Sequence, residues 1–91
     1  MAIEIDYYIG KRLRRRRRVL GLTQQQLGDR LGIRFQQVQK YECGANRISA
    51  ARLWYLANAL ETDIKYFYDG FEEVPSKEGA KHRMMAEDAA A

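Results

Sequence analysis

The sequence predicts an all-α fold in which five short helices surround one small core. Apolar residues recur at helical spacing in five successive segments of the chain. The 91 residues include a single proline, which favours helices because proline interrupts their hydrogen bonding. A chain of this length predicts one small domain with little room for an enclosed enzyme active site. Residues that suit a helix N-cap stand before four of the five segments: Asp6, Thr23, Ser49 and Asp63.

The first predicted helix runs from about Tyr7 to Leu20, with Asp6 as its N-cap. Between these ends lies the run KRLRRRRR, Lys11 to Arg18, in which seven of eight side chains are cationic. Like charges repel one another along a helix. The run is therefore either a solvated face or a surface that borders a polyanion. An apolar stripe on the same helix faces the core: Ile9, Leu13 and Leu20.

The central stretch QQQLGDRLGIRFQQVQKYE contains two helices rather than one. Leu27 and Leu31 lie one turn apart on one helix face. Val38 and Tyr41 lie one turn apart on a second face. Gly32 stands between the two pairs, where the end of a helix needs a residue that tolerates a positive φ.

A glycine within the first of these helices indicates a close crossing. Gly28 would cost about 1 kcal/mol relative to alanine there unless another segment needs the space. Thr23 and Gln26 fit a capping box that starts this helix, which we expect to end at Leu31. The second helix spans about Arg34 to Cys43. Two short helices that are joined by a tight glycine turn and cross steeply form a helix-turn-helix.

Two further helices complete the predicted domain of residues 1–70. A fourth helix is expected from Ala50 to Leu60, and a short fifth helix from Ile64 to Tyr68. Residues 71–91 are polar and rich in small side chains, so they predict a flexible tail and a candidate contact for a protein partner. Three aromatic residues near the fifth helix form either a dimer contact or a capped edge of the domain: Tyr66, Tyr68 and Phe71.

The net charge of +4 conceals an uneven distribution. The segment Lys11–Arg52 holds 12 basic and 2 acidic residues. This block indicates a polyanionic partner, with nucleic acid first and an anionic membrane surface second. No apolar run approaches the ~20 residues of a membrane span, and the N-terminus lacks an apolar signal core. The single Cys43 agrees with a reducing compartment, so the expected location is the cytoplasm.

The helix-turn-helix stretch resembles the DNA-binding domain of Cro and phage-repressor proteins, also called the xenobiotic-response-element class of bacterial regulators. The resemblance covers about Ile9 to Gly70. It implies a compact, phage-repressor-like domain of five helices that binds double-stranded DNA as a homodimer and acts as a repressor. The matching pieces are Leu22-Thr23-Gln24, Leu27 through Gly32, Val38 and Lys40-Tyr41-Glu42.

In a helix-turn-helix the second helix enters the major groove, and its N-terminal residues reach base edges. Glutamine can bond adenine at N6 and N7, and arginine can bond guanine at O6 and N7. Phe35 either contacts a thymine methyl group or packs against the preceding helix. Arg34 departs from the family pattern, which usually has Ser or Thr at this capping position. The candidates for base readout are Arg34, Phe35, Gln36, Gln37 and Lys40.

Four residues are candidates for phosphate contacts: Arg17, Gln24, Asn46 and Arg47. Gln24 stands at a helix N-terminus, where free N–H groups favour a phosphate oxygen; the alternative is a plain first-turn residue. The resemblance implies that the loop with Asn46 and Arg47 lies along the DNA backbone. It also implies that Arg17 pairs with Glu42, and a guanidinium paired in this way keeps donors for a phosphate.

Four functions compete for this sequence. The leading one is a sequence-specific DNA-binding regulator. The alternative is an antitoxin of a toxin–antitoxin pair, which uses the same domain for autoregulation and the tail to bind its toxin. A membrane-active basic helix is weakened because the arginines surround the first helix rather than facing a broad apolar stripe. No paired carboxylates, nucleophile with a base, metal cluster or phosphate loop appears, so no enzyme, metal or cofactor is expected.

Overall fold

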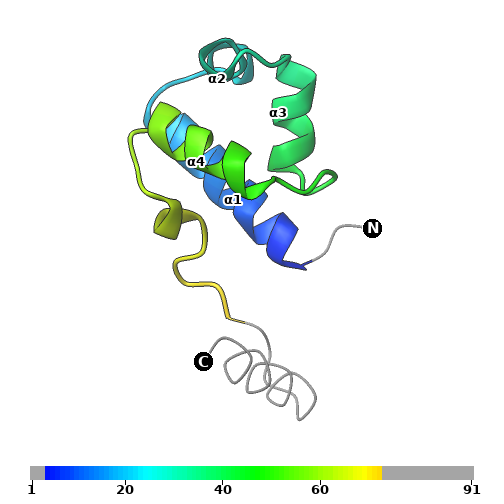
Figure 1. Cartoon of the computed structure of the whole chain (residues 1–91), viewed down its shortest axis with the longest axis vertical. Helices are drawn as coiled ribbons and strands as arrows, with labels where there is room; N and C mark the ends of the chain where they lie inside the picture. The colour runs from blue at the N-terminus through cyan, green and yellow to red at the C-terminus, as the bar shows by residue number, and fades with distance from the viewer. Residues whose placement is uncertain (1–3, 73–91) are drawn as a thin grey trace.

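The computed structural model describes residues 4–72 of the chain. These residues form four α-helices and one turn of 3-10 helix without a strand, which confirms the all-helical fold class. The predicted tail lies outside the described residues from residue 73 onward. In chain order the elements are α1 (Glu4–Val19), α2 (Gln24–Leu31), α3 (Phe35–Glu42), α4 (Ala50–Ala59) and the 3-10 helix η1 (Ile64–Phe67) (Figure 1).

Two elements differ from the sequence prediction. Helix α1 starts at Glu4, so Asp6 lies inside its first turn rather than at its N-cap. A carboxylate in the first turn interacts favourably with the helix dipole, so this position also suits Asp6. The expected fifth helix is a 3-10 turn of four residues, in which Asp63 accepts a hydrogen bond from the backbone N–H of Tyr66. The count of five α-helices is therefore not confirmed.

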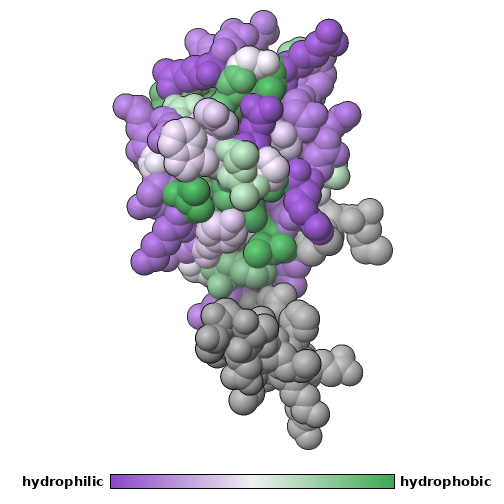
Figure 2. All heavy atoms as spheres, viewed as in Figure 1, coloured by the Kyte–Doolittle hydropathy of each residue, from purple (hydrophilic) through white to green (hydrophobic). Residues whose placement is uncertain are grey.

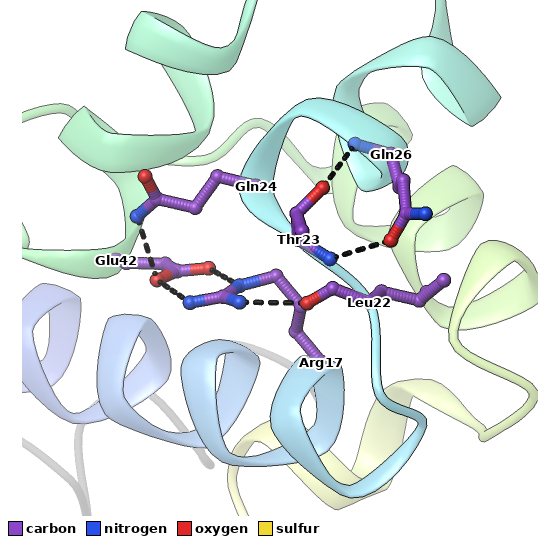
Figure 3. Close-up of polar contacts among 6 residues, drawn as sticks. All are labelled: Arg17, Leu22, Thr23, Gln24, Gln26 and Glu42. Carbon is purple, nitrogen blue, oxygen red and sulfur yellow. Dashed lines mark hydrogen bonds and ion pairs between the residues drawn. The ribbon is translucent and has the colours of Figure 1, made fainter.

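The start of the helix-turn-helix has the predicted capping box. Thr23 accepts a hydrogen bond from the backbone N–H of Gln26, and the Gln26 side chain accepts one from the N–H of Thr23 (Figure 3). Gly32 ends α2 with a φ of 69°. Helix α3 begins after Arg34, whose side chain makes no capping hydrogen bond. The first turn of α3 therefore has backbone N–H groups without a side-chain cap.

A small core joins all five elements. Burying a large aliphatic or aromatic side chain contributes roughly 1.5–3 kcal/mol, so this core is the main support of the domain. Six side chains are fully buried, and each of the five elements supplies one of them. The sixth is Leu60, which directly follows α4. These side chains are Leu13, Leu27, Val38, Leu56, Leu60 and Phe67.

Two glycines let other segments approach their helices closely. A β-carbon at Gly10 would lie 2.6 Å from the carbonyl oxygen of Glu42, so only glycine allows α1 and α3 to cross at this distance. A β-carbon at Gly28 would lie 2.6 Å from the carbonyl oxygen of Ile33. The space at Gly28 is thus taken by the turn rather than by the body of α3. Together the two glycines fix the position of α3 against α1 and α2.

Candidate nucleic-acid interface

Helix α3 presents one face to the core and the opposite face to solvent. Val38 and Glu42 are buried, whereas Gln36 and Lys40, which lie one turn apart, are exposed. Gln37 is half-buried because it lies at the flank of the helix, next to Val38. Four of the five residues predicted to read bases are therefore open to a ligand: Arg34, Phe35, Gln36 and Lys40.

The start of α3 combines a cation with an exposed ring. Phe35 is the first residue of the helix, and 39% of its surface is exposed. Arg34 is exposed at the N-cap position, and its guanidinium, which only donates hydrogen bonds, cannot cap the backbone N–H groups that begin the helix. An exposed ring beside an unused guanidinium can contact a thymine methyl group and a guanine edge in a major groove.

A buried ion pair holds the other side of α3. Arg17 Nε lies 2.6 Å from Glu42 Oε2, and Arg17 Nη2 donates to Glu42 Oε1 at 3.0 Å (Figure 3). The remaining terminal nitrogen, Nη1, donates to the carbonyl oxygen of Leu22 at 2.8 Å. The side chains of Arg17 and Glu42 are 10% and 3% exposed. Because the pair is bidentate and buried, it ties the end of α1 to the end of α3.

Gln24 joins this network from the first position of α2. Its Nε2 donates to Glu42 Oε1 at 3.1 Å, so three helices meet at one carboxylate (Figure 3). The structure thus brings together Arg17 and Gln24, two of the four residues predicted to contact phosphate. Each already uses donors within the protein. Their phosphate contacts stay predictions, and the small exposed surface of Arg17 leaves it little room for one.

The loop between α3 and α4 carries the other two predicted phosphate contacts. Asn46 and Arg47 are both exposed. Arg47 Nε lies 3.3 Å from Asp6 Oδ2 on α1, and 67% of its side chain remains exposed. Gly44, with a φ of 75°, turns the chain at the start of this loop. Arg47 therefore has one weak internal partner and remains accessible to a phosphate.

The basic run of α1 divides into two groups. Three arginines bond within the domain. Besides Arg17, Arg12 donates to the carbonyl oxygen of Tyr66 at 2.9 Å, and Arg16 donates to those of Leu60 at 2.9 Å and Glu61 at 3.0 Å. Since Leu60 and Glu61 follow α4, Arg16 satisfies carbonyls at a helix C-terminus, where a cation is favourable. The second group is exposed: Lys11, Arg14, Arg15 and Arg18.

A groove of about 410 Å³ lies where α1, the start of α2 and the end of α3 meet. Gln39 is exposed in this groove, and the sequence prediction did not include it among the functional residues. Its spacing of three residues from Gln36 could have indicated it, because residues at i and i+3 share a helix face. The groove is lined by Tyr7, Lys11, Arg14, Gln24, Gln39, Glu42 and Cys43.

Within residues 4–72 no group of three or more histidine, cysteine or acidic side chains could hold a metal ion. None of the described helices is long and apolar enough to cross a bilayer.

Comparison with known sequences gives a consistent result. The family model described as "Helix-turn-helix" matches residues 13–67. A helix-turn-helix-type transcriptional regulator of Sinorhizobium medicae is 45% identical over 83 residues, which cover 91% of this chain and 58% of that protein. A transcriptional regulator in the ATPase CF(0) region of Rhodospirillum rubrum is 50% identical over 68 residues, covering 75% of this chain and 63% of that protein. The chain thus spans a little over half the length of such relatives.

Two solved structures resemble the domain. The restriction-modification controller protein C.AhdI of Aeromonas hydrophila is 30% identical with a TM-score of 0.64, covering 67% of this chain and 92% of that one. The P22 c2 repressor, solved with a synthetic operator, is 27% identical with a TM-score of 0.63, covering 69% and 96%. The match of the family model, the identity to named regulators and the geometry of α2 and α3 agree. The chain belongs to the Cro-type helix-turn-helix family of DNA-binding transcriptional regulators.

Proposed function

We propose that this domain binds a specific double-stranded DNA site in the cytoplasm, as a homodimer, and represses transcription there. The observation that carries the proposal is the exposed face of α3, where Gln36 and Lys40 point away from a backbone held by the buried Arg17–Glu42 pair. Rigid presentation of polar side chains suits base readout, because base edges must be met within hydrogen-bond distance. The P22 c2 repressor, whose structure includes an operator, supports the repressor role.

The proposal divides the labour between two groups of residues. Bases are read by the five residues predicted from the sequence, which are the N-cap of α3 and four residues of the helix: Arg34, Phe35, Gln36, Gln37 and Lys40. Asn46 and Arg47 contact the phosphate backbone, and Gln24 contacts it from the start of α2. Phosphate contacts position a protein on the duplex without reading sequence, whereas base contacts specify. Arg17 acts in this scheme chiefly by holding Glu42 and hence α3.

Exposed apolar surface supports the homodimer. Tyr66 and Phe71 are used internally: the Tyr66 ring lies 3.9 Å from the Arg12 guanidinium, and the Phe71 ring centroid lies 5.2 Å from that of Tyr8. Figure 2 shows apolar and weakly polar residues gathered on the face that carries α4 and η1 in Figure 1, bordered by hydrophilic ones. Four large apolar side chains are exposed on α4, on η1 and at the residue after η1: Trp54, Tyr55, Ile64 and Tyr68.

Selection of bound sites from random duplex DNA tests the proposed function. We expect enrichment of one motif with two-fold symmetry, whose half-sites lie about one helical turn or roughly 34 Å apart. Gln36→Ala should relax preference at one base position in each half-site. Gln25→Ala is a matched control, because Gln25 is an exposed glutamine of α2 with no predicted base contact. Absence of any enriched motif, or a footprint of one half-site at saturation, would contradict the proposal.

A further inference from the structure

The exposed cations of α1 lie on one face of the helix. Residues 11, 14, 15 and 18 are related by steps of three, four and seven, which place side chains on one side of an α-helix. All four are exposed, in contrast to Arg12, Arg16 and Arg17, which bond within the domain. We call Lys11, Arg14, Arg15 and Arg18 the outer stripe.

The outer stripe has no carboxylate partner among residues 4–72. The two ion pairs of this part of the chain are Arg17–Glu42 and Arg47–Asp6. Lys11 is placed by the ring of Tyr7, whose centroid lies 4.7 Å from Nζ. Four like charges within about two turns repel one another, so the stripe costs stability in the free protein. A polyanion bound along the helix would relieve this repulsion.

The stripe adjoins the edge of α3 at Gln39, which lies three residues after Gln36 on the helix. Lys11 and Arg14 line the groove of about 410 Å³ together with Gln24 and Gln39. The same two residues, with Arg15, Arg18 and Val19, line an adjoining open hollow of about 440 Å³. The carboxylate of Glu42 also lines the first groove, but Arg17 neutralises its charge. Positive charge therefore extends from the edge of α3 along α1.

We propose that the outer stripe binds the sugar–phosphate backbone of the duplex beyond the base pairs that α3 reads. This inference rests on the proposed function, since it concerns the same duplex. From Lys11 to Arg18 the helix rises about 10 Å, at ~1.5 Å per residue. One DNA strand presents about three phosphates over that distance, at roughly 3.4 Å each along the axis. With α1 along the duplex axis, the four cations would therefore face about three phosphates of one strand.

The surroundings of the stripe favour DNA over a lipid surface. A membrane-binding helix needs a broad apolar face beside its cations. Two exposed large apolar residues of α1 adjoin the stripe within the described chain, one beyond each end: Tyr7, whose ring lies against Lys11, and Val19, in the hollow next to Arg18. They are separated by the length of the stripe and do not form a broad apolar face. The other neighbours that join the stripe to α3 are the polar Gln24 and Gln39. These amides add hydrogen-bond donors that suit phosphate oxygens.

The test compares two duplexes that contain the same selected site. One is trimmed to the base pairs of the selected motif, and the other has about one further helical turn, roughly 10 base pairs, of scrambled flank on each side. The variant is Arg15→Gln with Arg18→Gln, and the control is Lys65→Gln, which removes an exposed cation on η1. Binding of the full chain is measured across a salt series, and circular dichroism melting checks the fold.

We expect the double variant to lose only the contribution of the flanks. On the long duplex, the slope of log K against log salt should fall by roughly 0.9 for each lost phosphate contact, with about tenfold weaker binding at low salt. On the trimmed duplex the double variant should bind with the affinity of the wild type. The control Lys65→Gln should keep the wild-type affinity and salt slope on both duplexes. Lys11→Gln with Arg14→Gln, a second variant, should also weaken binding to the long duplex.

Two results would overturn the inference. One is a double variant that binds the long duplex with the wild-type slope, which would leave the stripe to solvent or to an acidic protein. The other is equal weakening of binding to both duplexes, which would place Arg15 and Arg18 against the base pairs of the selected motif itself. Both results leave the selection of a specific site intact, so they reject only the proposed contact between the outer stripe and the flanking backbone. A failure to select any site would instead reject the proposed function.

Discussion

Two arginine–carboxylate pairs in this domain use the same chemistry in different surroundings. Arg17 and Glu42 form two hydrogen bonds of 2.6 and 3.0 Å, and their side chains are 10% and 3% exposed. Arg47 meets Asp6 through one contact of 3.3 Å, and 67% of its side chain is exposed. Both pairs link residues that are distant in sequence, but only in the first are both side chains removed from water, since the second joins the exposed Arg47 to an Asp6 side chain that is 11% exposed.

The difference assigns a separate role to each pair. A buried pair is costly to break, because loss of one partner leaves the other as an uncompensated charge. The Arg47–Asp6 pair contributes less, because water and salt compete for the exposed Arg47 guanidinium. Arg17 therefore suits a fixed joint between α1 and α3, whereas the exposed guanidinium of Arg47 suits the phosphate contact that we propose for it.

The largest effect is expected at the buried pair. Arg17→Met or Glu42→Leu alone should lower the free energy of unfolding by about 3–5 kcal/mol, because each leaves a buried charge without a partner. The double variant should be more stable than either single one. Urea denaturation, monitored by circular dichroism, gives the free energy of unfolding of the wild type, the two single variants and the double variant. Additive effects of the two substitutions would show that the two residues are not coupled.

The crossing at Gly10 should show an effect of intermediate size. In an ordinary helix interior, replacement of glycine by alanine is stabilising by about 1 kcal/mol. Gly10→Ala should instead destabilise the domain by about 1–3 kcal/mol, since its β-carbon would lie 2.6 Å from the carbonyl oxygen of Glu42. Thermal melting gives the sign directly. A stabilised variant would mean that α1 and α3 separate without cost.

The smallest effect is expected at the Arg47–Asp6 pair. Asp6→Asn should change the free energy of unfolding by less than about 1 kcal/mol, because the Arg47 guanidinium is mostly hydrated. Freed from the carboxylate, Arg47 should bind phosphate slightly better, which would raise affinity for cognate and scrambled duplexes alike, by up to about fivefold. Arg47→Ala combined with Asp6→Asn should abolish this gain. If the higher affinity for DNA persisted in the variant without Arg47, another residue would be its cause.

Much of the fold could be predicted because local signals set it. The Thr23–Gln26 capping box and the positive φ of Gly32 define the ends of α2 within the sequence itself. The 3-10 turn at Ile64–Phe67 could not be distinguished from a short helix, since four residues hold too little periodicity. The crossing at Gly10 was missed because its cause is the backbone of α3, which is distant in sequence.

The candidate site was less accessible to prediction. The exposed face of α3 follows from helical spacing, which separates Gln36 and Lys40 from Val38. Which cations of the basic run bond within the domain depends on the backbone carbonyls of Leu60, just after α4, and Tyr66, in η1. These carbonyls accept hydrogen bonds from Arg16 and Arg12 and have no signature in the sequence. A residue's acceptor can be a backbone atom anywhere in the fold, and periodicity carries no information about it.

The central claim is that α3 reads bases while the α3–α4 loop contacts the backbone. Its most direct test is the binding of Gln36→Ala and Arg47→Ala to cognate and scrambled duplexes across a salt series. Gln36→Ala should cost about 1–3 kcal/mol on the cognate duplex alone, and Arg47→Ala should weaken both duplexes and lower the salt slope by roughly one. Equal weakening of both duplexes by Gln36→Ala, with altered base preference in Arg47→Ala, would contradict the claim.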